Sequence, residues 1–286
     1  MKTYSSYFYI IILIVSSICL STCSDDKANP LDENGIDDSL KIDGYDLVWN
    51  DEFDGSSIDI SKWGHEINGN GGGNNELQYY TNRSDNSYVK DGKLFIIAKK
   101  EQYTDTDGTK EYTSARMRTL NKGDWLYGRV EVSAKLPSGR GTWPAIWMLP
   151  SDWEYGGWPA SGEIDIMEHV GYDPNVVHGS VHTSAYNHTI GTQKSSKLLI
   201  PTAQSDFHVY VVEWFADRIN FYIDDQLYFV FNNEIAGWEK WPFDKRFHLI
   251  LNIAVGGNWG GIQGIDNNIF PATMEIDYVR VYEKNN

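Results

Sequence analysis

Short apolar runs, rich in β-branched and aromatic side chains, recur along most of the chain and are separated by Gly, Asn and Asp, which favour turns. The clearest runs cover Lys93–Lys99, Tyr127–Leu136, Phe207–Phe215, Arg218–Ile223, Gln226–Phe231, Phe247–Val255 and Met274–Tyr282. Asp224-Asp225 lies between two of these runs and predicts a tight hairpin turn. No long segment shows the helical apolar period of about 3.6 residues, so the pattern predicts an all-β protein with few helices.

The first part of the chain has a different pattern. A short positive start precedes an apolar run over residues 8–20, which is shorter than a transmembrane helix requires. Leu20-Ser21-Thr22-Cys23 follows directly and resembles the cleavage site of a bacterial lipoprotein signal. This resemblance implies a signal peptide over residues 1–22 and a lipid on the Cys23 thiol. The alternative is an ordinary secretory signal with an incidental cysteine.

Residues 23–43 are polar and acidic, which predicts a flexible tether. The stretch Ser24-Asp25-Asp26-Lys27 resembles the surface-export tag of bacterial lipoproteins, so we expect an outer-membrane protein exposed at the cell surface. Residues 44–286 are then expected to form one β-sandwich domain, because all-β domains of this length are ordinary. That domain contains no cysteine and therefore no disulfide.

The composition limits the partners of the chain. It has 40 Asp and Glu against 24 Lys and Arg, for a formal net charge of −16. Simple electrostatics therefore argues against a nucleic acid or an anionic polysaccharide as partner, whereas a neutral polysaccharide fits. Aromatic residues make up 14% of the chain, a loading that is common where carbohydrate is bound and that also builds sandwich cores.

The segment Glu163-Ile164-Asp165-Ile166-Met167-Glu168 places three carboxylates among apolar neighbours. In a regular β-strand the side chains alternate faces, so Glu163 and Asp165 share a face whereas Glu168 points to the other. A β-bulge at about Ile166-Met167 adds one residue and returns Glu168 to the face of the other two acids. The spacing therefore predicts three acids in one groove.

Two Glu side chains that flank one bond are what a retaining glycosidase needs, one as carboxylate nucleophile and one as proton donor. For such a motif alone, the alternatives are a solvated strand edge and a calcium site. Upstream, Trp143 and Trp147 share one face if their segment is extended. Flat aromatic rings beside carboxylates are typical of a polysaccharide cleft, so this context favours the glycosidase.

Several segments together resemble family 16 glycoside hydrolases of the bacterial laminarinase and mixed-linkage β-glucanase type, in the branch whose catalytic strand carries an extra residue. They are Trp49–Gly55, Asn74–Thr81, Tyr127–Glu131, Trp143–Pro150, Ser161–Glu168, His178–His182, Asn252–Trp259 and Met274–Tyr282. The resemblance spans about residues 45–283. It implies a concanavalin A-like jelly roll, in which two curved antiparallel sheets form an open concave cleft.

At matched positions the resemblance implies a nucleophile at Glu163, a general acid and base at Glu168, and an assisting acid at Asp165 between them. Like-charge repulsion from the other two acids favours the protonated form of Glu168, which the first step requires. Three interacting acids share their protons, so their ionisation belongs to the group.

Aromatic rings and one histidine are further candidates for the substrate site. By family position, Trp143, Trp147 and Trp259 are expected to stack on pyranose rings. His182 lies four residues after His178 and on the same face of an extended segment. A metal pair lacks a third ligand at suitable spacing, so we expect His182 to hydrogen-bond the substrate or a neighbouring site residue.

Polar residues complete the expected site. Asn75, Glu76 and Arg116 resemble residues that bind sugar hydroxyls on the non-reducing side of the cleft. The glycine-rich stretch Gly69–Gly73 is expected to form a mobile loop near the cleft. It is not expected to bind phosphate, because no Lys-Ser/Thr signature follows it.

A structural calcium ion on the convex side is common in this family. The matching neighbourhood in this chain is Glu52, the backbone around Gly92, and Asp277. We expect no cofactor for catalysis, because carboxylates alone carry out the reaction. We also expect a monomer.

The function implied by the resemblance is an endo-acting, retaining hydrolysis of β-1,3-glucan or mixed-linkage β-1,3/1,4-glucan. One alternative is a surface glycan-binding lipoprotein without turnover, although a binder has no need of the three acids. Another is a related enzyme of the same fold that acts on a different polysaccharide. The sequence leaves open the choice between laminarin and mixed-linkage glucan.

Overall fold

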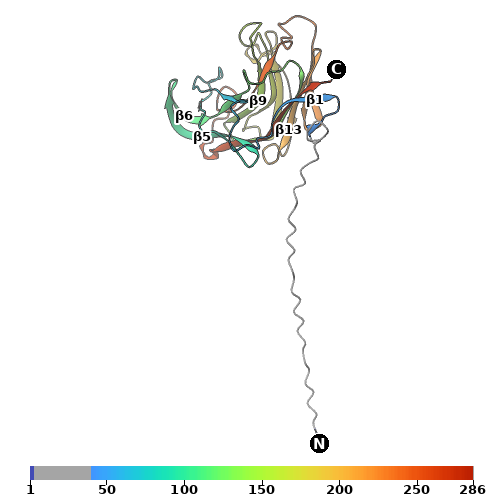
Figure 1. Cartoon of the computed structure of the whole chain (residues 1–286). Helices are drawn as coiled ribbons and strands as arrows, with labels where there is room; N and C mark the ends of the chain where they lie inside the picture. Colours follow the sequence, from blue (N-terminus) through green and yellow to red (C-terminus); the bar gives the residue numbers. More distant parts are fainter. Residues whose placement is uncertain (3–39, 286) are drawn as a thin grey trace. The chain divides into compact units, whose positions relative to one another are not determined.

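The computed structural model describes residues 1–2 and 40–285 of the chain. Cys23, most of the predicted signal peptide and most of the predicted tether lie outside the described residues. From Ile42 onward the chain forms one compact unit (Figure 1). The described helical structure is limited to short 3-10 turns such as η2 (His188–Ile190) and η3 (Asn267–Ile269). None of the described helices has the length and apolar character that crossing a membrane requires.

Residues 42–285, the described part of this unit, contain seventeen strands. They are β1 (Tyr45–Asp51), β2 (Gly64–His65), β3 (Gln78–Tyr80), β4 (Ser87–Lys90), β5 (Lys93–Asp105), β6 (Gly108–Ser114), β7 (Arg116–Arg118), β8 (Gly128–Lys135), β9 (Thr142–Pro150), β10 (Glu163–His169), β11 (Val176–His182), β12 (Lys194–Leu199), β13 (His208–Trp214), β14 (Arg218–Ile223), β15 (Gln226–Asn232), β16 (Phe247–Val255) and β17 (Ala272–Lys284). The predominance of strands confirms the prediction of an all-β protein.

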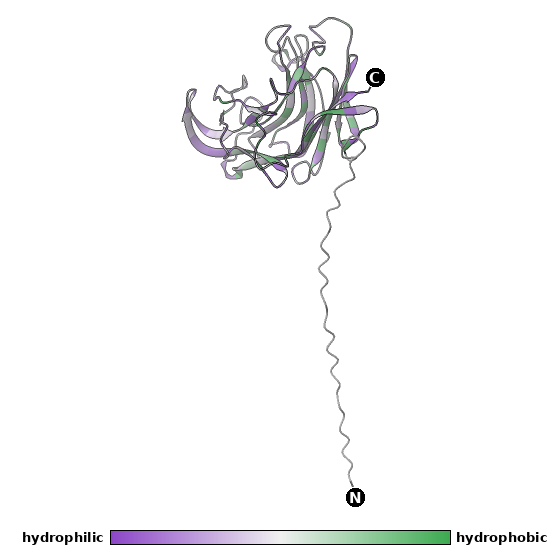
Figure 2. Ribbon diagram, in the orientation of Figure 1, coloured by the Kyte–Doolittle hydropathy of each residue, from purple (hydrophilic) through white to green (hydrophobic). Residues whose placement is uncertain are grey.

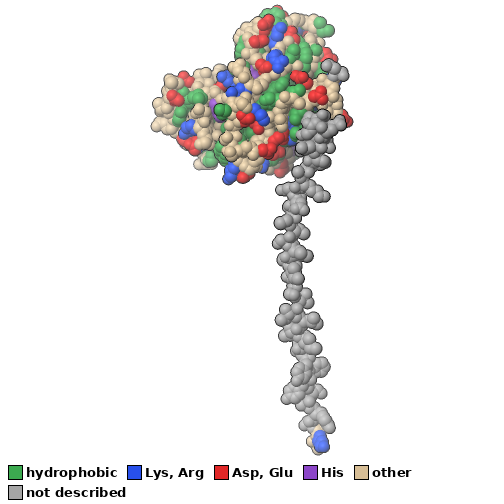
Figure 3. All heavy atoms as spheres, in the orientation of Figure 1, with side chains coloured by type: hydrophobic (Ala, Val, Ile, Leu, Met, Phe, Trp, Pro, Cys, Tyr) green, Lys and Arg blue, Asp and Glu red, His purple; other side chains and the backbone are tan. Residues whose placement is uncertain are grey.

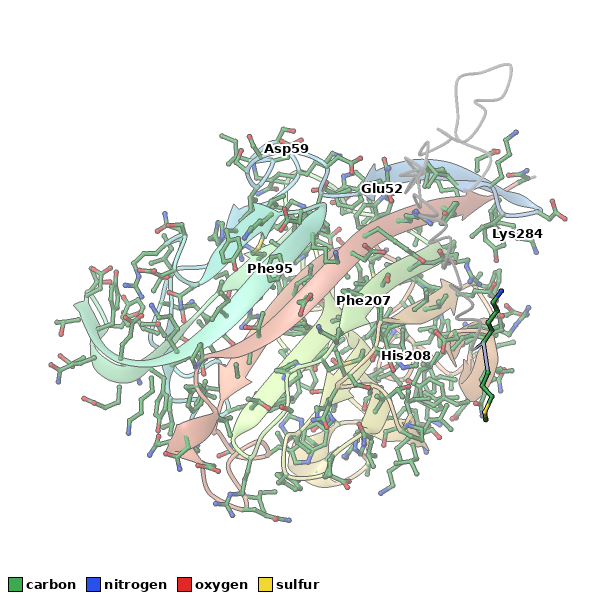
Figure 4. All side chains as sticks on the ribbon, turned by 90° about the horizontal axis from the view of Figure 1, so that it is seen from below. Glu52, Asp59, Phe95, Phe207, His208 and Lys284 are labelled. Carbon is green, nitrogen blue, oxygen red and sulfur yellow. The ribbon has the colours of Figure 1, made fainter. Side chains whose placement is uncertain are left out.

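The strands form two sheets. The ten-stranded sheet runs β15-β14-β13-β8-β17-β5-β6-β3, with β1 on β17 and β4 on β5, and the seven-stranded sheet runs β12-β11-β10-β9-β16-β7-β2. Figure 4 looks onto the outer face of the larger sheet, where Phe95 and Glu52 are labelled. Neighbouring strands are antiparallel, except that the short β3 pairs in parallel with β6. Sequence order and sheet order differ, so strands distant in the chain lie side by side.

The core lies between the two sheets. Alternate residues of β5, namely Leu94, Ile96 and Ala98, are fully buried, and the residues between them are partly exposed. Figure 2 shows hydrophobic and hydrophilic residues in turn along the strands, and the far end of the β5–β6 hairpin is hydrophilic. Burying a Leu or Ile side chain contributes about 1.5–3 kcal/mol. The inner face therefore holds the sheets together, and the opposite face of the smaller sheet is left for a site.

The structure confirms the strands that the sequence predicted with the clearest patterns. The predicted runs Arg218–Ile223 and Phe247–Val255 coincide with β14 and β16. Asp224-Asp225 joins β14 to β15, with Ile223 paired to Gln226 across the turn. The pattern did not identify β6 and β12, because each carries mostly polar residues at an edge or an exposed hairpin and has no clear apolar alternation.

Candidate active site

The β10 strand carries the three acids, and its pairing contains the predicted bulge. Asp165 pairs with Ser180 and Glu168 with His178 on β11, so three steps along β10 match two along β11. The pairing with β9 shifts between Asp165 and Met167 as well. The extra residue turns Glu168 to the side of Glu163 and Asp165, because it reverses the alternation once.

The apolar residues of the same strand point the other way. Ile164, Ile166 and Met167 are fully buried and belong to the core between the sheets. Glu163 and Glu168 keep partial solvent access, and both line the open face of the sheet. The amphipathic character of β10 therefore holds the strand in place and presents the acids outward.

Two adjoining hollows, each with a volume of about 310 Å³, form the cleft. The first hollow is lined on one side of the acids by residues that include Glu76, Arg116, Trp147, Trp158 and Asn252. The second is lined on the other side by residues that include His178, Ser180, His182, Ser195 and Trp259. Both hollows share Asn74, Trp143, Glu163, Glu168 and His188. The acids thus lie where the two halves of the cleft meet.

Glu163, Asp165 and His182 form a tight group. His182 Nε2 lies 3.3 Å from Asp165 Oδ2 and 3.8 Å from Glu163 Oε1. The carboxyl groups of Glu163 and Asp165 are hydrogen-bonded to each other, which requires one proton between them. Burial is the main cause that raises the pKa of both acids, and the charge of the neighbouring acids adds to it. Both acids therefore hold a proton more tightly than an isolated carboxyl group does.

Glu168 has a different environment. Trp143 donates a hydrogen bond from Nε1 to Glu168 Oε1 at 3.0 Å. Burial raises the pKa of Glu168, and the charge of His182 and the bond from Trp143 lower it in part. A carboxyl group with a raised pKa can carry a proton near neutral pH, which is what a general acid must do.

The structure brings the predicted Trp residues to the cleft. Trp143 and Trp259 meet edge to face, with ring centroids 5.5 Å apart. The Arg116 guanidinium lies 4.6 Å from the ring centroid of Trp147, and Trp147 Nε1 donates to Asn252 Oδ1 at 2.7 Å. These contacts fix the orientation of each ring, so the rings are held ready to receive a sugar face.

Glu76 and Arg116 also reach the cleft. Glu76 is buried and accepts hydrogen bonds from Gln78 Nε2 at 2.7 Å and from the Tyr80 hydroxyl at 3.1 Å. Arg116 pairs with Glu66 at 3.0 Å. The glycine-rich loop lies beside them as predicted, with Gly72 and Gly73 on the wall of the first hollow.

Asn75 is placed differently from the other predicted site residues. It lines neither hollow, is exposed, and donates from Nδ2 to Asn258 Oδ1 at 2.9 Å. Its neighbour Asn74 lines both hollows. Asn75 has a positive φ of 56°, so the chain turns at this point.

Sequence reasoning missed several cleft residues. Trp158 and Asn252 line the first hollow, Ser195 the second, and His188 both. Asn252 stood inside a family motif, so its position was a usable signal. The other residues lie in loops or on an edge strand, where no regular pattern marks which side chains face the cleft.

One of the residues predicted to hold calcium takes part in an ion pair. Both carboxylate oxygens of Glu52 are engaged by Arg280, at 3.0 and 2.8 Å. Among the described residues, the acids and histidines close enough to share an ion are Glu163, Asp165 and His182. Calcium at Glu52, Gly92 and Asp277 stays a prediction, and it would depend on backbone carbonyls or on a shift of Arg280.

The comparisons with known proteins agree with this site. The model of glycosyl hydrolases family 16 matches residues 74–280. A β-glucanase from Rhodothermus marinus is 55% identical over 257 residues, which cover 87% of this chain and 88% of that protein. The laminarinase structure from Rhodothermus marinus has a TM-score of 0.82 at 54% identity and covers 85% of this chain and 98% of that chain.

A further structure contains a bound oligosaccharide. It is a variant of SCLam, a non-specific endo-β-1,3(4)-glucanase, co-crystallised with 1,3-β-D-cellotriosyl-glucose. Its TM-score is 0.82 at 46% identity, with 85% of this chain and 96% of that chain covered. The family match and the identity extend over most of the chain, and the two-sheet sandwich is the jelly roll of these enzymes. The chain is therefore a glycoside hydrolase and belongs to family 16.

Proposed function

We propose that this enzyme hydrolyses internal bonds of β-1,3-glucan or mixed-linkage β-1,3/1,4-glucan with retention of configuration. The observation that carries the proposal is the convergence of Glu163, Asp165 and Glu168 across the β10 bulge, where the two halves of the cleft meet. The names of the β-glucanase and laminarinase relatives support the substrate. A cleft that continues on both sides of the acids supports internal cleavage, because sugar units can then bind on both sides of the bond.

In the first step Glu163 attacks the anomeric carbon, and Glu168 gives its proton to the oxygen of the leaving sugar. The bond between that carbon and that oxygen breaks, and a glycosyl ester forms on Glu163. Glu163 must be ionised to attack, so the proton that the two acids share must move to Asp165, which then donates a hydrogen bond to Glu163. Asp165 thus keeps the nucleophile ionised and oriented.

In the second step Glu168 acts as a base. It removes a proton from a water molecule, the water attacks the anomeric carbon, and the ester to Glu163 breaks. Two inversions at one carbon restore the original configuration. The Trp143 bond to Glu168 suits both steps, because it stabilises the carboxylate that remains after the first proton transfer.

The nucleophile is tested by replacing Glu163 with Gln. We expect Glu163→Gln to lower kcat on laminarin and on barley β-glucan by at least about 10³-fold, because the ester cannot form. The variant should still be retarded in an affinity gel that contains the glucan, since the Trp residues and hydroxyl-binding groups remain. Full activity of this variant would refute the assignment.

The acid and base are tested by replacing Glu168 with Gln. We expect a loss of about 10²–10⁴-fold on the polysaccharide. A substrate with a good leaving group needs no proton, so its first step should be partly restored, and azide should then intercept the ester as a β-glycosyl azide. Failure of every rescue would contradict the role. A wild-type chain that binds glucan without any product would instead identify a binding protein.

Anchoring through Cys23 at the cell surface extends the proposal. It is supported by the signal-like segment and the acidic stretch that follows it. A lipid on Cys23 would hold the enzyme beside polysaccharide that arrives from outside the cell.

A further inference from the structure

His188 lies where the two halves of the cleft meet. It belongs to η2, in the connection between β11 and β12, and lines both hollows together with Glu163 and Glu168. A glucan chain that passes the acids from one half to the other must therefore pass His188. No motif in the sequence marks this residue.

The turn that carries His188 is held by its neighbour. Asn187 is 3% exposed and caps η2, because its Oδ1 accepts from the backbone N–H of Thr189 at 3.1 Å. Asn187 Nδ2 donates to the carbonyl oxygens of Thr183 at 3.1 Å and Ser184 at 3.3 Å. A buried side chain that joins both ends of a turn fixes it in place, so the position of His188 is built into the fold.

The imidazole of His188 contacts two rings of the site. Its centroid lies 5.1 Å from the Trp158 ring and 5.2 Å from the His182 ring. His182 in turn contacts Asp165 and Glu163. The residue is exposed, and within the described part of the chain its ring nitrogens have no hydrogen-bond partner. Both nitrogens are therefore available to a ligand.

The surroundings also favour the neutral form of the ring. Burial against its neighbours lowers the pKa of His188, and the charge of His182 lowers it further. A neutral imidazole has one donor and one acceptor nitrogen, the combination that suits a sugar hydroxyl, which can donate and accept.

We propose that His188 is a substrate-binding residue that hydrogen-bonds a hydroxyl group of a glucosyl unit next to the bond being cleaved. This inference rests on the proposed glucanase function and adds a specificity-determining contact to it. Because β-1,3- and β-1,4-linked units present their hydroxyls in different directions, one fixed imidazole cannot serve both linkages equally. His188 therefore affects the choice of linkage at the cleavage point.

The test compares His188→Ala with Ile190→Ala. Ile190 lies on the same turn, is 60% exposed and lines neither hollow, so it is a matched control. We expect His188→Ala to lower kcat/KM on laminarin by about 5- to 10-fold, the loss of one hydrogen bond, and to change the ratio of laminarin to lichenan activity. Ile190→Ala should stay within about 2-fold of wild type on both.

Two further measurements separate binding from structure. His188→Gln can still hydrogen-bond a hydroxyl, so it should recover part of the activity that His188→Ala loses, and the Tm of all three variants should match wild type. Unchanged kcat/KM and linkage ratio in His188→Ala, or an equal loss in Ile190→Ala, would overturn the inference. Absence of glucanase activity in the wild-type enzyme would instead overturn the proposed function.

Discussion

His182 lies against the acid cluster. Its Nε2 lies 3.3 Å from Asp165 and 3.8 Å from Glu163, closer to the acids than a residue that only binds sugar would need to be. Burial raises the pKa of Glu163 and Glu168, and the charge of His182 opposes that rise for both. A single imidazole therefore offsets part of the cost of placing three acids together.

Replacing His182 with Ala should shift the pH profile of kcat/KM upward. The acid limb reports ionisation of the nucleophile Glu163, and the alkaline limb reports loss of the proton from Glu168. Without the opposing charge of His182 both pKa values rise, so both limbs move to higher pH. The measurement is kcat/KM on laminarin across the pH range in which the variant stays folded.

His208 provides the control for this experiment. It lies on β13 in the other sheet and pairs with Asp224 at 2.9 Å, away from the acid cluster. His208→Ala should leave both limbs in place. A His182→Ala profile that coincides with wild type would show that His182 does not set the ionisation of the acids.

At the scale of elements, β10 and β11 work as a pair. The bulge in β10 sets the direction of Glu168, and β11 places His178, Ser180 and His182 on the same open face. Gly179 lies between these residues and faces the core, where a Cβ would meet Tyr228 Oη at 2.4 Å and Phe221 Cδ1 at 3.1 Å. The close packing of β11 against the larger sheet therefore helps to hold its neighbour β10, which carries the acids, in position.

Gly179→Ala should lower stability because it overfills this contact. We expect a loss of about 1–3 kcal/mol, since the Tyr228 and Phe221 rings are rigid and must shift. For a domain of this size that corresponds to a Tm lower by roughly 2–10 °C, measured by differential scanning calorimetry. The ratio of activities on laminarin and lichenan should stay unchanged, because the methyl group faces the core.

Gly157→Ala is the matched control for that substitution. A Cβ at Gly157 meets nothing within 4 Å, and its φ is ordinary for an L-residue. Its Tm should equal or slightly exceed that of wild type. Equal Tm values for Gly179→Ala and wild type would mean that the two sheets can separate locally without cost.

At the scale of the whole molecule, the acidic net charge should act on charged polysaccharides and leave neutral ones unaffected. The chain carries a formal charge of −16, and on the face in Figure 3 acidic and basic side chains are interspersed. A neutral glucan carries no charge, so neither counterion release nor electrostatic steering contributes to its binding. Its binding depends on stacking and hydrogen bonds. A negatively charged glucan is repelled at long range.

Salt should therefore affect the two kinds of substrate differently. On laminarin, kcat/KM should change by less than about 2-fold between roughly 50 and 500 mM NaCl. On a carboxymethylated β-1,3-glucan it should rise with salt, because screening weakens the repulsion from the enzyme. A strong salt dependence on laminarin would contradict a binding mode without charge contacts.

Much of the architecture could be predicted from the sequence. Strands such as β14 and β16 are rich in apolar and aromatic residues, a pattern that is clear in a single sequence. The bulge could be predicted from the alternation of side chains along a strand, since acids at positions 163, 165 and 168 cannot share one face of a regular strand. Edge strands such as β12 escaped detection because half of their surface faces water and permits polar residues.

The sequence by itself determined the strand-rich class and the acid-bearing strand, because these depend on local periodicity and on residue types within short segments. Its resemblance to family 16 glycoside hydrolases implied the sandwich and the Trp residues near the acids. The tertiary structure decided which loop residues line the cleft: His188 lines both hollows, whereas Asn75 lines neither. It also decided that His182 contacts Asp165 and Glu163. Such contacts join residues on different strands and loops, and their distances depend on sheet curvature and loop closure, which no local pattern encodes.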